Sequence, residues 1–362
     1  MYVCGITPYD TTHLGHARTF LIFDVIARLL EATGHPVRYV QNVTDIDESI
    51  LQRATRDGAD WRDLGKREER AFLADMKRLG WRRPDVIAHA TRELPAMFEL
   101  IRKLERRHAA YALPRGLYFP VAAHRRYGEL SRLSPAAMKR ILARQDDAAL
   151  EDPGRRDARD FALWRVVDEG PTWPSPWGRG RPGWHVECSA MIRHHLGDQI
   201  DIHGGGMDLV YPHHENEIAQ SETATGRRPF VRMWVHVAAM QLDGKKMSKS
   251  DGNMVFVGET LEVTEPRALR LYLLGRHYRK AFDHDEALLD RARLRIKVLD
   301  AGFGRGPVGP IGRDRLTRGA VAALEDDLDV ARAVRLIESS VSRVDAKTRA
   351  SLRAVARIIG IA

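Results

Sequence analysis

The sequence predicts an α/β fold built on a parallel sheet. A short apolar segment at residues 2–5 is followed by a long segment with helical spacing of apolar residues, 13–35, and then by a β-branched segment, 37–43. Strand, helix and strand in this order are typical of a right-handed parallel crossover. Two later apolar segments, 199–204 and 230–240, have the length and composition of further buried strands.

The domain organisation follows from changes in these patterns. An α/β domain is expected at 1–255, with its first helix ending near Gly34. The segment at about 62–165 has mostly helical spacing and is predicted to be an insertion into this domain. A helical connector is expected at 256–305, and a C-terminal helical bundle at 306–362, around the glycine- and proline-rich linker GFGRGPVGPIG.

The composition argues against several classes of protein. The chain of 362 residues has two cysteines, so a cytoplasmic, reducing compartment is expected rather than a disulfide scaffold. It has neither an apolar run long enough to span a bilayer nor the pattern of a signal peptide. The formal net charge of +9 fits a polyanionic partner such as tRNA, although a solvated basic surface would give the same value.

The motif HLGH, His13 to His16, lies where the first long helix is expected to begin. A helix N-terminus offers free backbone N–H groups and a partial positive charge, which suit a phosphate. Gly15 would let an adenine or a ribose lie against the backbone, and His13 and His16 could donate to phosphate oxygens. By itself, however, such a motif is more often an ordinary helix start.

A second motif, KKMSKSDGN, brings Lys246 and Lys249 close together in a loop of small residues. Two lysines there could bind a triphosphate and stabilise the charge that develops during displacement at the α-phosphorus. A loop of this composition is by itself usually a solvated turn. The two motifs in one chain therefore indicate a nucleotide site more strongly than either does alone.

Four residues from distant segments form a candidate metal site. Cys4 ends the first strand, Cys188 follows GWHVE, and His213 and Glu217 are four residues apart, which suits one face of a helix. Thiolates, an imidazole and a carboxylate are suitable zinc ligands. Taken singly, each residue has a structural alternative, because cysteine is commonly a small buried hydrophobe and a lone histidine is more often structural.

Together these motifs resemble those of a known family. HLGH and KMSKS are similar to the paired signatures of class I aminoacyl-tRNA synthetases. YVCGITPYDTTHLGHARTF, NVTDID, GWHVECSAM and DIHGGGMDLVYPHHENEIAQSE resemble the motif series of cysteinyl-tRNA synthetases and of their sister family, the cysteine ligases of mycothiol biosynthesis. The resemblance covers nearly the whole chain. It implies a Rossmann-type catalytic domain that makes cysteinyl-adenylate from L-cysteine and ATP.

The resemblance also implies cofactors and residue roles. One Zn²⁺ per chain would bind the substrate thiolate, and Mg²⁺ would accompany ATP. Because zinc is thiophilic and lowers the pKa of a thiol, serine and alanine would be rejected without editing. The implied zinc ligands are Cys4, Cys188, His213 and Glu217. The implied catalytic residues are His13, His16, Lys246 and Lys249, the cysteine pocket is Gly5, Thr7, Thr44 and Trp184, and further ATP contacts are Gly15, Gly204, Gly205, Gly206 and Asp208.

Three interpretations of the acceptor remain. Transfer to tRNA-Cys leads, because PHHENEIAQSE has the form of the tRNA enzymes and the chain is basic. Transfer to the amine of glucosaminyl-inositol, or a similar small amine, is the alternative, because CGITPYDTTHLGHA and VQNVTD look more like the sugar ligases and no anticodon-binding module is expected after the bundle. A non-catalytic RNA-binding paralogue is the third, against which the retained motifs argue. A monomer without membrane association is expected.

Overall fold

The computed structural model describes residues 1–10, 12–145, 151–247 and 252–362, with the backbone alone at Lys246. The chain forms two compact units, which we call unit 1 and unit 2. Unit 1 comprises Met1–Asp10, Arg38–Glu69 and Pro84–His236. Unit 2 comprises Thr11–Val37, Arg70–Arg83 and Val237–Ala362. The domain boundaries expected from the sequence stay a prediction.

Unit 1 is built around a five-stranded sheet with the strand order β3-β2-β1-β8-β9. Its strands are β1 (Tyr2–Ile6), β2 (Val40–Val43), β3 (Val86–His89), β8 (Ile200–Gly206) and β9 (Val231–Val237). β1 pairs in parallel with both β2 and β8, and β2 pairs in parallel with β3. The α/β fold class with a parallel sheet is therefore confirmed.

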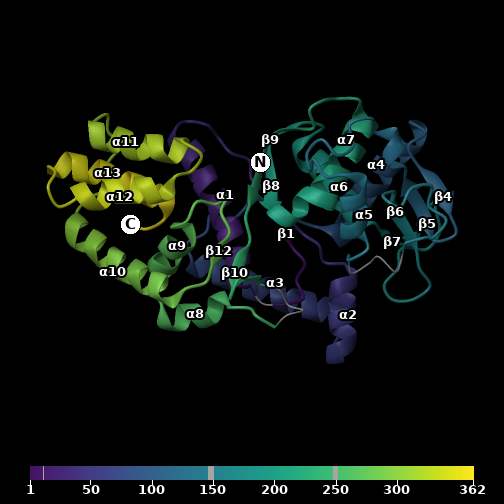
Figure 1. Cartoon of the computed structure of the whole chain (residues 1–362), viewed down its shortest axis with the longest axis horizontal. Coiled ribbons are helices and arrows are strands. Elements are labelled where there is room, and N and C mark those ends of the chain that lie inside the picture. The colour runs from purple at the N-terminus through teal and green to yellow at the C-terminus, as the bar shows by residue number, and fades with distance from the viewer. Residues whose placement is uncertain (11, 146–150, 248–251) are drawn as a thin grey trace. The chain divides into compact units, whose positions relative to one another are not determined.

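Several helices surround this sheet in unit 1, and three of them pack together on it (Figure 1). The helices are α2 (Glu48–Asp57), α4 (Leu94–Arg106), α5 (Pro135–Leu142), α6 (Trp184–Leu196) and α7 (Glu215–Thr225), and α3 (Trp61–Arg78) runs from unit 1 into unit 2. Short 3₁₀ turns lie at Ala90–Arg92, Val121–Ala123 and Met207–Leu209. Helix α6 packs against β2, α4 and α7. Its apolar side chains, among them Val186 and Met191, are fully buried, so α6 belongs to the core rather than to the surface.

The segment expected to be a mostly helical insertion also contains strands. An antiparallel sheet has the order β4-β5-β6-β7 and consists of β4 (Tyr111–Leu113), β5 (Gly116–Phe119), β6 (Phe161–Val166) and β7 (Gly180–Pro182). β4 and β5 have only 3 and 4 residues, too few for an alternating pattern to stand out from the helical spacing around them. The same segment supplies β3 to the main sheet.

Unit 2 consists mainly of helices. They are α1 (Leu14–Ala32), α8 (Val257–Val263), α9 (Pro266–Leu274), α10 (Glu286–Phe303), α11 (Arg315–Glu325), α12 (Val330–Ser340) and α13 (Ala346–Ile359). A small sheet, β11-β10-β12, is formed by β10 (Met240–Leu242), β11 (Lys245–Lys246) and β12 (Phe282–Asp283). The segment 230–240, expected to be one strand, thus contains the whole of β9 and the first residue of β10, Met240. Among the described residues, no helix is long and apolar enough to cross a membrane.

A buried ion pair holds two helices of unit 2 together. Asp24 on α1 and Arg270 on α9 are both fully buried, and the guanidinium of Arg270 donates to the carboxylate of Asp24. Arg270 also donates to backbone carbonyls of Ile359 and Leu79. These additional hydrogen bonds satisfy the guanidinium, which a buried charge requires.

Candidate active site

The four residues predicted to bind a metal lie together in unit 1. Cys4 is in the middle of β1, Cys188 lies in the first half of α6, and Glu217 is in the first turn of α7. His213 precedes α7, in the irregular turn Val210–His214. All four side chains are buried, and one donor atom from each lies within 4.8 Å of the others. The fold thus brings together segments that are far apart in the sequence.

The distances within this cluster suit a tetrahedral ion. The Sγ atoms of Cys4 and Cys188 are 4.0 Å apart, and both cysteines are free. Two thiolates on one tetrahedral zinc, each about 2.3 Å from the ion, lie about 3.8 Å apart. The Oε1 atom of Glu217 is 3.7 Å from Cys4 Sγ and 2.9 Å from Nε2 of His213. The donor set therefore fits zinc.

The pKa values of Cys188 and His213 also bear on metal binding by the cluster. Burial opposes charge on Cys188, but hydrogen bonding with Cys4 and the positive charge of His213 outweigh it and lower the pKa of Cys188 to about 6. Burial likewise opposes charge on His213, yet the negative charges of Cys188 and Glu217 raise its pKa to about 10. The unfolded values are about 8.5 for cysteine and 6.5 for histidine. Burial and the neighbouring Cys188 raise the pKa of Cys4 well above its usual value, so the positive charge stabilised on His213 compensates Cys188 and Glu217.

Further histidines hold the ligands in place. His203 Nε2 is 2.7 Å from Oε2 of Glu217, and His185 Nδ1 is 3.0 Å from Nδ1 of His213. Such partners fix the orientation of a ligand and, for a histidine, its tautomer. Sequence reasoning missed His185 and His203, although both lie inside the motifs GWHVECSAM and DIHGGGMD. Their role depends on contacts that only the fold creates.

A second arrangement of ligands is also possible around the same carboxylate. Cys4, His203, His214 and Glu217 form another buried group whose donor atoms lie within 4.8 Å of one another. His214 Nε2 is 3.4 Å from Cys4 Sγ, and its Nδ1 is 2.8 Å from Nε2 of His236. This group has one thiol instead of two. The set that includes Cys188 is the better zinc site, because zinc binds soft thiolates strongly.

The residues expected to form a cysteine pocket are close to this cluster in the chain or in space. Gly5 follows Cys4, and its N–H donates to the Asn42 side chain at 2.8 Å. The amide of Asn42 in turn donates to the Thr44 hydroxyl at 3.1 Å. The Trp184 ring stacks on His213, with ring centroids 4.3 Å apart. A side chain at Gly5 would collide with the carbonyl of Asn42, so glycine is needed for the approach of β1 to β2.

Thr7, the remaining residue of the expected pocket, follows β1, and its carbonyl accepts a hydrogen bond from the N–H of Tyr9. Glu187, next to Cys188, is buried against Thr44, and burial raises the pKa of its carboxyl group well above the usual value. Its Oε2 atom has no hydrogen-bond partner among the described residues. Sequence reasoning did not single out Glu187.

The glycines expected to approach adenosine end β8, next to Cys4. Val3 pairs with Gly204, and a Cβ atom at Gly205 would lie 3.5 Å from Cβ of Cys4 and 2.8 Å from the Leu209 side chain. A Cβ atom at Gly206 would collide with the side chain of Asp208. A side chain at Gly205 or Gly206 would therefore have to displace the end of the Leu209 or Asp208 side chain. The expected contacts of Gly204 to Gly206 and Asp208 with ATP stay a prediction.

The HLGH motif belongs to unit 2 and begins α1, as the sequence predicts. His13 is the N-cap residue, and its Nδ1 accepts a hydrogen bond of 3.1 Å from the N–H of Gly15. The rings of His13 and His16 stack with centroids 3.8 Å apart. A Cβ atom at Gly15 would be 3.6 Å from Cβ of Met240, so the helix start lies against β10.

The lysine motif KKMSKSDGN begins in the small sheet of unit 2. β10 pairs in antiparallel fashion with β11, which ends at Lys246. The structure therefore brings the HLGH helix start near the strands that precede KMSKS. Lys249, the other lysine with an expected catalytic role, lies outside the described residues.

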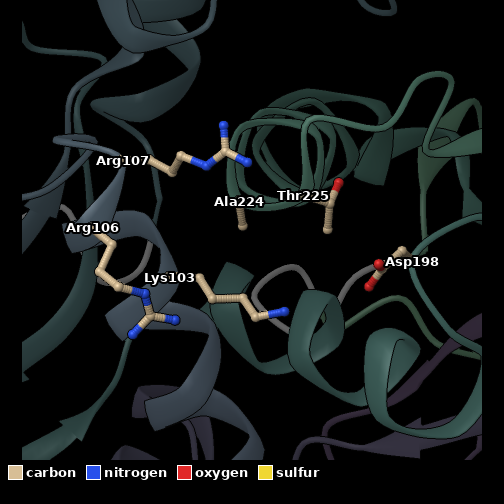
Figure 2. Close-up of a pocket in the computed structure, with 6 residues that line it drawn as sticks. All are labelled: Lys103, Arg106, Arg107, Asp198, Ala224 and Thr225. Atoms are coloured by element: carbon tan, nitrogen blue, oxygen red, sulfur yellow. The ribbon is translucent and has the colours of Figure 1, made fainter.

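A separate pocket of about 300 Å³ in unit 1 does not carry this chemistry. It is lined by Lys103, Arg106, Arg107, Asp198, Ala224 and Thr225. Figure 2 shows Lys103 pointing toward Asp198 and Arg107 toward the helix end that carries Ala224. The pocket lies where α4 and α7 end, and basic side chains complement the partial negative charge of helix C-termini. This accounts for the basic lining without a bound anion.

Comparison with known proteins identifies the family. Residues 1–294 match the family model described as tRNA synthetases class I (C) catalytic domain. The chain belongs to this family. The predicted resemblance to cysteinyl-tRNA synthetases and their sister ligases is therefore confirmed, and ligase chemistry on a class I synthetase domain follows for this chain.

Relatives of both sister activities are similar to the chain. An L-cysteine:1D-myo-inositol 2-amino-2-deoxy-alpha-D-glucopyranoside ligase of Frankia alni is 46% identical over 351 residues, which cover 94% of this chain and 82% of the relative. A cysteine--tRNA ligase of Rippkaea orientalis is 40% identical over 355 residues, covering 93% and 72%.

Solved structures show the same fold. Methionyl-tRNA synthetase of Mycobacterium tuberculosis, bound by methionyl-adenylate, matches with a TM-score of 0.69 and 17% identity over 99% of this chain and 90% of that one. At this low identity the match supports the class I synthetase fold and carries nothing about substrate.

Proposed function

We propose that this chain uses ATP to join L-cysteine to the amine of 1D-myo-inositol 2-amino-2-deoxy-α-D-glucopyranoside. The observation that carries this proposal is the set of relatives. Seven relatives named for that reaction are 42–46% identical over 93–95% of the chain. The cysteine--tRNA ligase, at 40%, is more distant. The sequence motifs alone are divided and favour tRNA by a narrow margin, whereas the identities of the relatives support the amino-sugar acceptor.

Recognition of cysteine is assigned to the buried cluster. Cys4, Cys188, His213 and Glu217 would hold the metal, which would supply a thiophilic Lewis acid for the substrate thiol. His203 keeps the carboxylate of Glu217 oriented, at 2.7 Å. The local surroundings exclude water, because all four ligands are buried.

Activation and transfer then follow in two balanced steps. A carboxylate oxygen of cysteine attacks the α-phosphorus of ATP, and pyrophosphate leaves. The amine nitrogen of the acceptor attacks the carbonyl carbon of the adenylate, AMP leaves, and the nitrogen loses a proton to give an amide. In this proposal His13 and His16 donate to phosphate oxygens, and Lys246 and Lys249 stabilise the pyrophosphate, with Mg²⁺ bound to ATP. These groups act by positioning and by electrostatic stabilisation.

The decisive experiment offers two acceptors to the same preparation. Purified protein with zinc, ATP and labelled cysteine is incubated with the amino sugar–inositol in one reaction and with total tRNA in another. We expect a base-stable amide of the sugar and no label on tRNA. Base-labile label on tRNA, without the amide, would overturn the proposal in favour of cysteine--tRNA ligase activity.

A partial reaction separates failure of cysteine activation from failure of the acceptor assignment. Cysteine-dependent exchange of pyrophosphate into ATP needs no acceptor, so it should proceed whichever acceptor is used. Cys188→Ser should lose this exchange together with the metal held by Cys4, Cys188, His213 and Glu217. Ser189→Ala is the matched control, because Ser189 is the next buried residue of α6 and its hydroxyl has no partner among the described residues. No exchange in a folded, zinc-loaded protein would support a non-catalytic paralogue.

A further inference from the structure

A second group of side chains that could hold a metal ion lies in unit 1. It is separate from the cysteine cluster, by which we mean Cys4, Cys188, His213 and Glu217. Glu93 directly precedes α4, and His194 and His195 are in the last turn of α6. His194 Nδ1 is 2.6 Å from Oε2 of Glu93, and His195 Nε2 is 2.9 Å from Oε1. One donor atom from each residue lies within 4.8 Å of the others. Two helices are thus connected through one carboxylate.

The arrangement goes beyond an ordinary ion pair at a helix end. Adjacent positions on a helix normally point about 100° apart around the axis. Here the rings of His194 and His195 nevertheless stack, with centroids 4.5 Å apart, and each presents a ring nitrogen to a different oxygen of the same carboxylate. Both imidazoles are therefore already directed to one point.

The separations suit two ligands on one ion. Imidazole nitrogens and carboxylate oxygens bind zinc at about 2.0–2.2 Å, so neighbouring donors on one tetrahedral ion lie about 3.3–3.6 Å apart. The nitrogen–oxygen distances of 2.6 and 2.9 Å would have to lengthen by about 0.4–1.0 Å to admit the ion, a change that side-chain rotation can supply. Two imidazoles and a carboxylate suit zinc, nickel and copper better than magnesium or calcium.

The three side chains differ in their exposure to solvent. The side chains of Glu93 and His195 are only 11% and 17% exposed, so packing holds them in place. The side chain of His194 is 57% exposed, so an ion can enter from solvent and keep water as a further ligand.

We propose that Glu93, His194 and His195 bind a second zinc ion, which joins the start of α4 to the end of α6. The ion acts as a staple between two core helices. Because α6 also carries Trp184 and Cys188, the staple fixes the far end of the helix that contributes to the cysteine cluster. The proposal does not depend on which acceptor the enzyme uses.

The number of zinc ions bound per chain tests this directly. Full-length protein is dialysed free of metal and titrated with Zn²⁺ against a chromophoric chelator. We expect two equivalents in the wild type and one in Glu93→Gln, which removes a charged ligand but keeps the shape of the side chain. His194→Ala provides a second variant at a more exposed position, in case Glu93→Gln disturbs the start of α4. His108→Ala, in the loop after α4, is the control and should keep two.

Removing the other site makes the outcome unambiguous. Cys4→Ser with Cys188→Ser should lose one equivalent and keep the one assigned to Glu93, His194 and His195. Cobalt substitution supplies a spectroscopic check, since only the thiolate site can give sulfur-to-cobalt charge-transfer absorption. The second Co²⁺ equivalent should add ligand-field bands without it. A wild type that binds one equivalent, or a second equivalent that survives both Glu93→Gln and His194→Ala, would overturn the proposal.

Discussion

Replacing His203 by alanine tests which side chains hold the metal of the cysteine cluster. Two buried ligand sets share Cys4 and Glu217 and differ in their other members. In the set that we favour, Cys188 is a ligand and His203 is only the partner that orients Glu217, through a contact of 2.7 Å. In the other set His203 is itself a ligand. The two sets therefore predict different orders of metal loss.

The size of the expected effect follows from that contact. Loss of a residue that is hydrogen-bonded to a metal ligand typically weakens metal binding 10–100-fold, or about 1.4–2.7 kcal/mol. We expect His203→Ala to fall in this range, because His203 and Glu217 are both fully buried and the contact is not screened by water. Cys188→Ala removes a ligand outright and should weaken binding by more than about 100-fold.

The assay is competition for Zn²⁺ between the protein and a chelator of known affinity. Circular dichroism serves as the control for whether each variant remains folded. His203→Gln serves as a matched variant, because its amide can still donate to Glu217 although glutamine is not a usual zinc ligand. It should recover part of the affinity that alanine loses. If His203→Ala weakens binding as strongly as Cys188→Ala, or if Cys188→Ala has the smaller effect, the favoured ligand set is wrong.

Three further predictions concern stability, measured as the free energy of unfolding in urea. Asp24→Asn leaves the fully buried guanidinium of Arg270 without its counter-ion and should lower the free energy of unfolding by about 3 kcal/mol. This is the low end for a broken buried pair, because backbone carbonyls still accept hydrogen bonds from Arg270. A loss below about 1 kcal/mol would contradict this expectation. Gly5→Ala should prevent normal pairing of the first two strands and give little folded protein, whereas a folded, active variant would show that the strand can move aside. The hydrogen bond of Glu69 outweighs burial and raises the pKa of His89, so this pair should add stability below about pH 6.5 and lose it as the pH rises through the higher folded value. Glu69→Gln should flatten that dependence, and an unchanged pH profile would remove His89 as its source.

Much of the fold of unit 1 could be predicted because its strands follow the simple pattern of a parallel sheet. β1, β2 and β8 are short and largely buried segments. The regular apolar spacing after the first strand likewise predicts α1, which belongs to unit 2. The antiparallel sheet of the insertion could not be predicted in the same way. Its strands are very short, and the pairing of β5 with β6 joins segments more than 40 residues apart, which no local pattern encodes.

Only some residues of the candidate site could likewise be predicted from the sequence. Cys4, Cys188, His213 and Glu217 could be grouped from the sequence because thiol, imidazole and carboxylate side chains stand out by their chemistry. His203 could not be given its role, because an orienting contact depends on where β8 lies relative to α7. Glu93, His194 and His195 escaped notice for a similar reason. Glu93 is about 100 residues from the two histidines in the sequence, and they come into contact only when α4 packs on α6.

Charge in the cluster connects metal binding with the folding of unit 1. Cys4 and Cys188, 184 positions apart, meet Glu217 only after β1, α6 and α7 have packed together. The Cys188 thiolate and the Glu217 carboxylate, buried at one point, carry negative charge that must be compensated, and without metal a proton on His213 is the available compensation. Since metal binding to such a site contributes directly to folding free energy, zinc should stabilise unit 1 as a whole. In the proposed mechanism, cysteine recognition is tied to the core of this unit, whereas the choice between an amine and a hydroxyl acceptor places no demand on the cluster. An enzyme of this family can therefore change its acceptor while keeping the same cysteine site.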